Sequence, residues 1–113
     1  MQREKFVDGL RSGIKFTDAE RNDIVKKAVE HRGVETTGII CMEEMAELQQ
    51  QISKYLRGCG DEISLLEEMA DAYICLEYIE KVFEIHPDQI LKAIDVKLLR
   101  EKGRLKDVRE FHQ

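Results

Sequence analysis

A five-residue acidic motif occurs twice, with one difference, in this chain of 113 residues. Glu43–Glu47 reads EEMAE, and Glu67–Asp71 reads EEMAD. Residues three apart share one face of a helix, so each copy presents a pair of carboxylates at that spacing. The pairs are Glu44 with Glu47 and Glu68 with Asp71.

Two antiparallel helices that face each other would bring all four carboxylates into one pocket. Like charges at close range repel, and burial strengthens the repulsion. A hard divalent cation such as Mg²⁺ would relieve it, because this ion prefers oxygen ligands and keeps several waters. Such a site suits a substrate that brings its own phosphate oxygens. The sequence therefore predicts a magnesium site built of oxygens.

The acidic motif has two other interpretations. A single Glu-x-x-Glu on a soluble helix is usually a solvated face, but two copies beside apolar seams favour function. A di-iron site in a helical bundle needs a Glu-x-x-His step on two helices. His31, His86 and His112 all lie outside that spacing, so a di-iron site is not predicted.

The apolar pattern predicts four helices that would position these acids. Thr17 and Glu20 form a capping box that begins a helix ending at about Arg32. A second helix is expected over residues 37–57, with Gly58 and Gly60 ending it. A third is expected from Asp61 or Ser64 to about residue 85, and the fourth begins at Pro87. The expected core stripes are Cys41, Met45, Leu48, Ile52 and Tyr55 in the second helix, and Leu66, Met69, Tyr73, Leu76 and Ile79 or Phe83 in the third.

Length and composition agree with an all-α fold. The chain has one proline, no tryptophan and 36% charged residues, and its length predicts a single domain over residues 1–113. Residues 1–16 are expected to be a loose N-terminal arm or a short helix.

Charge and cysteine content exclude several classes of protein. A net charge of −5 argues against nucleic acid as the main partner. The three cysteines show no zinc or disulfide pattern, which favours reduced thiols in a cytoplasmic protein. No apolar run is long enough to predict a membrane span.

The acidic motif also resembles a known family. Glu43-Glu44-x-x-Glu47 followed by Glu68-x-x-Asp71 is similar to the signature of the MazG-like all-α nucleoside triphosphate pyrophosphohydrolases. The similarity continues through the stretch Lys54–Gly58 and through Asp71-Ala72-Tyr73-Ile74, and it covers about residues 20–105. The short, single-domain members are the ones that the chain resembles.

The resemblance implies a four-helix MazG-like fold and a reaction. Members hydrolyse nucleoside triphosphates between the α and β phosphates with Mg²⁺, for which Mn²⁺ could substitute. By position, Glu44, Glu47, Glu68 and Asp71 would be the metal ligands. Glu43 would orient or deprotonate the attacking water.

The resemblance also extends to substrate contacts and assembly. Lys54, Lys97 and Arg100 would meet phosphates. Members are dimers or dimers of dimers that complete the substrate pocket across the interface, so a homodimer or homotetramer is expected. Two departures stand out: Thr36-Thr37-Gly38 replaces a polar turn that often contains glutamine, and Asp95 replaces a frequent asparagine.

Three alternatives stay open. The chain could be a phosphoribosyl-ATP pyrophosphohydrolase or a dimeric dUTPase, which share the acidic helices. It could also be a non-enzymatic helical module that binds a divalent ion or a partner helix.

Overall fold

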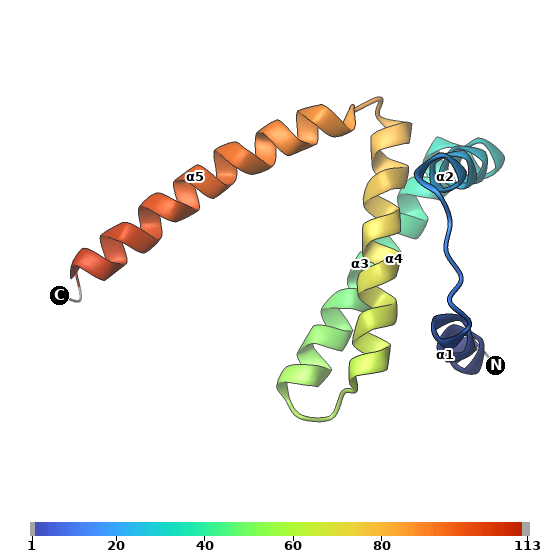
Figure 1. The fold of residues 1–113 in the computed structure, drawn as a ribbon, viewed down its shortest axis with the longest axis horizontal. Coiled ribbons are helices and arrows are strands. Elements are labelled where there is room, and N and C mark those ends of the chain that lie inside the picture. The colour runs from blue at the N-terminus through green and yellow to red at the C-terminus, as the bar shows by residue number, and fades with distance from the viewer. Residues whose placement is uncertain (1, 112–113) are drawn as a thin grey trace. The chain divides into compact units, whose positions relative to one another are not determined.

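All the regular secondary structure that the structure describes is α-helical. A computed structural model describes residues 2–111, with side chains as far as residue 106. Within that range there are five helices and no strand, which confirms the all-α prediction (Figure 1). They are α1 (Gln2–Ser12), α2 (Asp18–Arg32), α3 (Val34–Leu56), α4 (Glu62–Val82) and α5 (Pro87–Phe111). The chain divides after Phe83 into two compact units, the first containing α1 to α4 and the second α5.

Helices α3 and α4 form an antiparallel pair that lies side by side (Figure 1). The turn between them depends on two glycines. Gly58 has a φ of +78°, which glycine adopts without strain. At Gly60 a Cβ atom would lie 2.8 Å from the backbone nitrogen of Tyr55, so a side chain would clash with the end of α3. The predicted break at these glycines is confirmed.

The caps of α2 and α4 follow the predicted chemistry. The Thr17 hydroxyl accepts a hydrogen bond from the Glu20 backbone N–H (3.1 Å), and the Thr17 N–H donates to the Glu20 carboxylate (2.9 Å). Asp61 caps α4 by accepting from the Ser64 N–H at 2.9 Å. The capping box before α2 is confirmed, and Asp61 is the start signal of α4.

The boundary between α2 and α3 differs from the prediction. Gly33 has a φ of +84° and its N–H donates to Val29 O. One residue therefore makes the whole break, and α3 begins at Val34 rather than at Thr37. The Thr36-Thr37-Gly38 stretch lies inside the first turns of α3 instead of in a turn before it.

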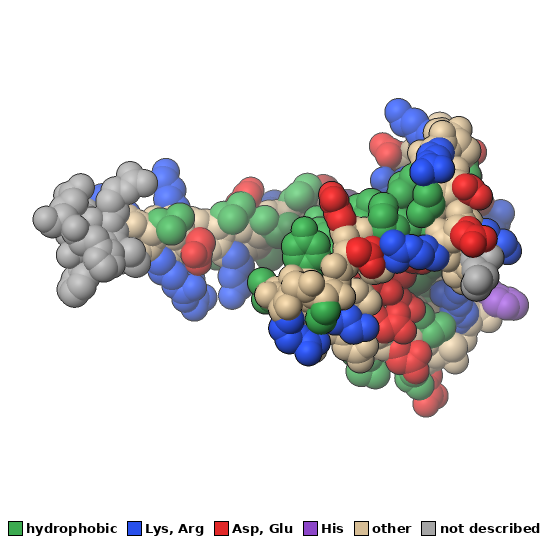
Figure 2. Space-filling view, turned by 90° about the horizontal axis from the view of Figure 1, so that it is seen from below, with side chains coloured by type: hydrophobic (Ala, Val, Ile, Leu, Met, Phe, Trp, Pro, Cys, Tyr) green, Lys and Arg blue, Asp and Glu red, His purple; other side chains and the backbone are tan. Residues whose placement is uncertain are grey.

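Few side chains are fully buried among the described residues. The buried apolar ones are Val25, Cys41 and Cys75, joined by Thr37. The stripe expected to form the core of α4 is exposed instead: Leu66 43%, Met69 42%, Tyr73 70% and Leu76 53%. That expectation was wrong for the single chain, because the face of α4 turned toward α3 carries Glu68, Asp71 and Cys75. Apolar side chains consequently lie open on the surface (Figure 2).

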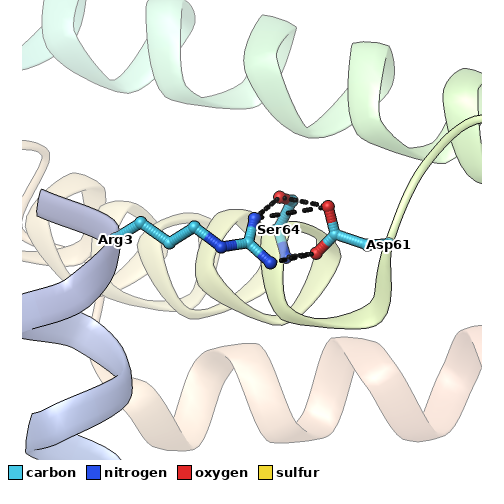
Figure 3. A network of polar contacts seen from close by, with 3 residues as sticks. All are labelled: Arg3, Asp61 and Ser64. Atoms are coloured by element: carbon cyan, nitrogen blue, oxygen red, sulfur yellow. Dashed lines mark hydrogen bonds and ion pairs between the residues drawn. The ribbon is translucent and has the colours of Figure 1, made fainter.

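The N-terminal segment, expected as a loose arm or a short helix, contains the helix α1. Its Arg3 guanidinium is bonded to the beginning of α4 (Figure 3). One nitrogen donates to Ser64 Oγ at 2.9 Å, and the other donates to Asp61 Oδ1 at 2.9 Å. This contact joins segments 58 residues apart in the sequence.

Candidate metal centre

Three carboxylates from α3 and α4 converge at the interface of the helix pair. Glu44, Glu68 and Asp71 each offer an oxygen, and these three oxygens lie within 4.8 Å of one another. Glu44 comes from α3, and Glu68 and Asp71 come from successive turns of α4. The antiparallel packing thus brings together three of the four carboxylates predicted as ligands.

Two oxygens in this cluster are buried without a hydrogen-bond partner. Glu44 Oε2 and Glu68 Oε2 have no partner among the described residues, although all three side chains are half-buried overall. A buried polar atom without a partner costs free energy. An all-oxygen donor set with unpaired buried oxygens fits Mg²⁺ or Mn²⁺, so the residues present are compatible with the predicted metal.

Burial and mutual repulsion raise the pKa values in the cluster. Burial is the largest cause at Glu44, followed by the charges of Asp71 and Glu47, and together they raise the Glu44 pKa to about 7. Burial, then the charges of Glu47 and Asp71, likewise raise the Glu68 pKa to about 7. Burial also raises the pKa of Asp71. Without a cation, the cluster therefore holds protons at pH values where ordinary carboxylates have lost them.

Glu47 and Glu43 lie on α3 beside the cluster. Both side chains are exposed, and neither belongs to the three-carboxylate group. Glu47 nevertheless acts on that group, because its charge raises the pKa of Glu44, Glu68 and Asp71. The predicted ligand Glu47 thus lies at the solvent side of the cluster, and the predicted base Glu43 is open to water.

The three predicted phosphate contacts come from the end of α3 and from α5. Lys54 is exposed near the end of α3, where it lines a surface depression with Gln50, Ser53 and Arg57. Lys97 and Arg100 are exposed on α5, in the second unit. Their contact with a phosphate stays a prediction.

Of the packing residues next to the cluster, Cys41 was predicted as a core position, whereas Thr37 and Cys75 were not. Thr37 and Cys41 precede Glu44 on one face of α3, and Cys75 follows Asp71 by one turn of α4. The Cys41 thiol donates to Cys75 O at 3.5 Å, and burial, followed by contact with Cys41, raises the Cys75 pKa to about 12. A thiol that stays protonated is a packing group rather than a nucleophile. The signal was the small size of these residues at the spacing of the helix seam.

Thr37 belongs to the stretch Thr36-Thr37-Gly38, where the sequence differs from the polar turn of the family that it resembles. Its side chain is 1% exposed, and its hydroxyl oxygen has no hydrogen-bond partner among the described residues. Thr37 therefore belongs to the packing of α3 rather than to an accessible surface. All three cysteines are free, with Cys59 exposed, and His112 lies outside the described residues.

Comparison with known proteins adds no relative. No protein-family model, curated protein or solved structure matches the chain. Within the described residues, no helix has both the length and the apolar character needed to cross a membrane.

Proposed function

We propose that this chain hydrolyses nucleoside triphosphates to the monophosphate and pyrophosphate, with Mg²⁺ or Mn²⁺ bound at the carboxylate cluster. The supporting observation is the convergence of Glu44, Glu68 and Asp71 within 4.8 Å. The resemblance of the acidic motif to the MazG-like pyrophosphohydrolases adds the reaction type. The proposed fold is accordingly the MazG-like one.

The residues of the cluster would hold the cation. Glu44 would bind it from α3, Glu68 and Asp71 would bind it from α4, and the exposed Glu47 would be the fourth ligand. The bound ion would hold phosphate oxygens and neutralise the charge that develops on them. Deprotonation of Glu44 and Glu68, whose pKa values are about 7, is required for binding.

Glu43 would activate the water. Its exposed carboxylate neighbours Glu44 in the chain and can accept a proton from a water molecule at the cluster. The water oxygen then bonds to the α phosphorus while the bond from that phosphorus to the bridging oxygen breaks. Pyrophosphate leaves with the electron pair of that bond, and Glu43 later releases its proton to solvent.

The products test this reaction. The full-length chain is incubated with Mg²⁺ and a panel of standard and modified nucleoside triphosphates. Monophosphate and pyrophosphate should appear together, and a chelator should abolish both. An α,β-imido analogue should inhibit, whereas a β,γ-imido analogue should still be cleaved between α and β. Early release of orthophosphate and a nucleoside diphosphate would contradict the proposal.

The same panel separates the related enzymes. Strong preference for dUTP would favour the dUTPase alternative, and turnover of phosphoribosyl-ATP alone would favour the phosphoribosyl-ATP pyrophosphohydrolase alternative. The non-enzymatic alternative draws support from the exposed apolar stripe on α4, which could bind a partner helix. It would show a melting temperature raised by Mg²⁺ with no pyrophosphate released from any triphosphate.

We also propose that a second copy of the chain covers this stripe. Leu66, Met69, Tyr73 and Leu76 share one side of α4 and are all more than 40% exposed. Fully burying a Leu or Met side chain contributes about 1.5–3 kcal/mol, and covering the exposed part of each side chain would contribute a share of that. A homodimer or homotetramer would add this buried apolar surface to the small core formed by Val25, Cys41 and Cys75.

A further inference from the structure

Arg3 makes the most specific polar contact outside the carboxylate cluster. Its guanidinium donates to both oxygens of Asp61, at 2.9 and 3.3 Å, and to Ser64 Oγ at 2.9 Å (Figure 3). Ser64 Oγ in turn donates to Asp61 Oδ2 at 2.9 Å. The planar fork of an arginine is thus fixed in direction by two acceptor side chains.

This network lies on the face of α4 that carries the cluster. Asp61, Ser64, Glu68 and Asp71 follow steps of three, four and three, which keep side chains on one side of a helix. Ser64 precedes Glu68 by one turn, a rise of about 6 Å. The hydrogen bond with Asp61 is the largest cause of the raised pKa of Arg3, and the charge of Glu67, next to Glu68, adds to it.

Stability alone gives a weak reason for this arrangement. The side chains of Arg3 and Asp61 are 54% and 50% exposed, and exposed ion pairs contribute at most about 1 kcal/mol. Asp61 already caps α4 without Arg3, through its bond from the Ser64 N–H. The contacts with Asp61 and Ser64 use three of the five N–H donors of a guanidinium. The other two donors lie outside this network.

We propose that Arg3 binds the terminal phosphate of a polyphosphate substrate whose inner phosphates lie at the carboxylate cluster. This inference rests on the proposed function and assigns a role to the N-terminal helix. Ser64, to which Arg3 donates, precedes Glu68 by one helical turn, and a triphosphate extends over a similar length. Asp61 and Ser64 are positioning residues that hold the fork in place. Arginine suits this task because its donors match two phosphate oxygens at once.

Inorganic polyphosphates test the proposal by titration calorimetry. Mg²⁺-tripolyphosphate and Mg²⁺-pyrophosphate are titrated into the full-length wild type, Arg3→Ala, Arg3→Lys and the control Lys5→Ala. Lys5→Ala also removes one positive charge from α1. Because Lys5 is exposed and lies on the other side of α1 from Arg3, this change leaves the Arg3 network intact. Arg3→Ala should weaken tripolyphosphate binding about tenfold through the loss of a charge-assisted contact, with pyrophosphate and Mg²⁺ binding unchanged. Arg3→Lys should be intermediate, and Lys5→Ala should bind like the wild type.

Three results would decide against the proposal. Unchanged tripolyphosphate affinity in both Arg3 variants would overturn it, and so would an equal loss for tripolyphosphate, pyrophosphate and Mg²⁺ alone, which indicates damage to the fold. Equal weakening in Lys5→Ala would show only a general charge effect. Parallel assays of triphosphate hydrolysis separate the two proposals. If the wild type hydrolyses triphosphates and Arg3→Ala binds tripolyphosphate as tightly as the wild type, only this inference is contradicted. If Arg3→Ala selectively loses tripolyphosphate binding but the wild type hydrolyses no triphosphate, only the proposed function is contradicted.

Discussion

At the scale of single residues, Glu67 and Glu68 are neighbours in the sequence with different surroundings. Only Glu68 belongs to the carboxylate cluster, and one of its oxygens is buried without a partner. Glu68→Gln keeps the shape but removes a ligand charge. We expect Mg²⁺ affinity and pyrophosphate release to fall by more than about tenfold, while the helical circular dichroism stays near that of the wild type.

Glu67→Gln is the matched control for that variant. It removes one carboxylate from the adjacent position, so both Mg²⁺ affinity and turnover should stay close to the wild-type values. Equal losses in the two variants would mean that the response reflects the total charge of α4 rather than coordination by Glu68.

For substitution of Glu43 we expect a different outcome, because Glu43 lies outside the three-carboxylate group. Glu43→Gln should lower kcat with little change in Mg²⁺ affinity, since the proton acceptor is lost and the ligands remain. Steady-state kinetics combined with a Mg²⁺ titration measures both quantities. A large loss of Mg²⁺ affinity would instead identify Glu43 as a ligand.

At the scale of elements, the α3–α4 pair carries a repulsion that depends on pH. Glu44 and Glu68 have an ordinary pKa of 4.5, and in the folded chain each has a pKa of about 7. The folded state therefore binds more protons than the unfolded state between these values. Its free energy of unfolding must fall as the pH rises through this window.

Thermal melting with a chelator present should show this fall. The melting temperature should decrease from about pH 4.5 to about pH 7, and Mg²⁺ should raise it most at the upper end, where the ligands are deprotonated. Glu68→Gln should flatten the pH dependence and weaken the response to Mg²⁺. A wild-type melting temperature that is indifferent to Mg²⁺ at pH 8 would contradict the clustered-acid explanation.

The elements also show which features local sequence could predict. The Thr17–Glu20 capping box and the break at Gly58 and Gly60 follow from short-range chemistry, and the helical period places Glu68 and Asp71 on one face of α4; the convergence with Glu44 also needs the antiparallel packing of α3 on α4. The contact of Arg3 with Asp61 does not, because it joins residues 58 positions apart and no periodicity links them. The end of α2 before Gly33 was predicted correctly, but the start of α3 was placed three residues too late, because the positive φ of Gly33 lets α3 begin directly at Val34.

At the scale of the whole molecule, local sequence patterns again cannot predict contacts between distant segments, and for this reason the apolar stripe of α4 was wrongly predicted to be buried. Periodicity identified that Leu66, Met69, Tyr73 and Leu76 share one face, but it could not identify what covers that face. Within the chain, α3 packs on the acidic face instead. Apolar residues at helical spacing can equally serve an interface between copies, where the core belongs to the assembly.

Sedimentation velocity tests this assignment of the apolar stripe. The wild type should sediment as a dimer or tetramer, and its melting temperature should rise with protein concentration. Tyr73→Glu places a charge in the middle of the stripe, at a side chain 70% exposed in the single chain, so it should produce monomers that keep their helical content. Lys81→Glu, an exposed site later on α4, is the control and should leave assembly unchanged. A monomeric wild type would leave the stripe without a second copy to cover it and would favour a different partner helix for this face.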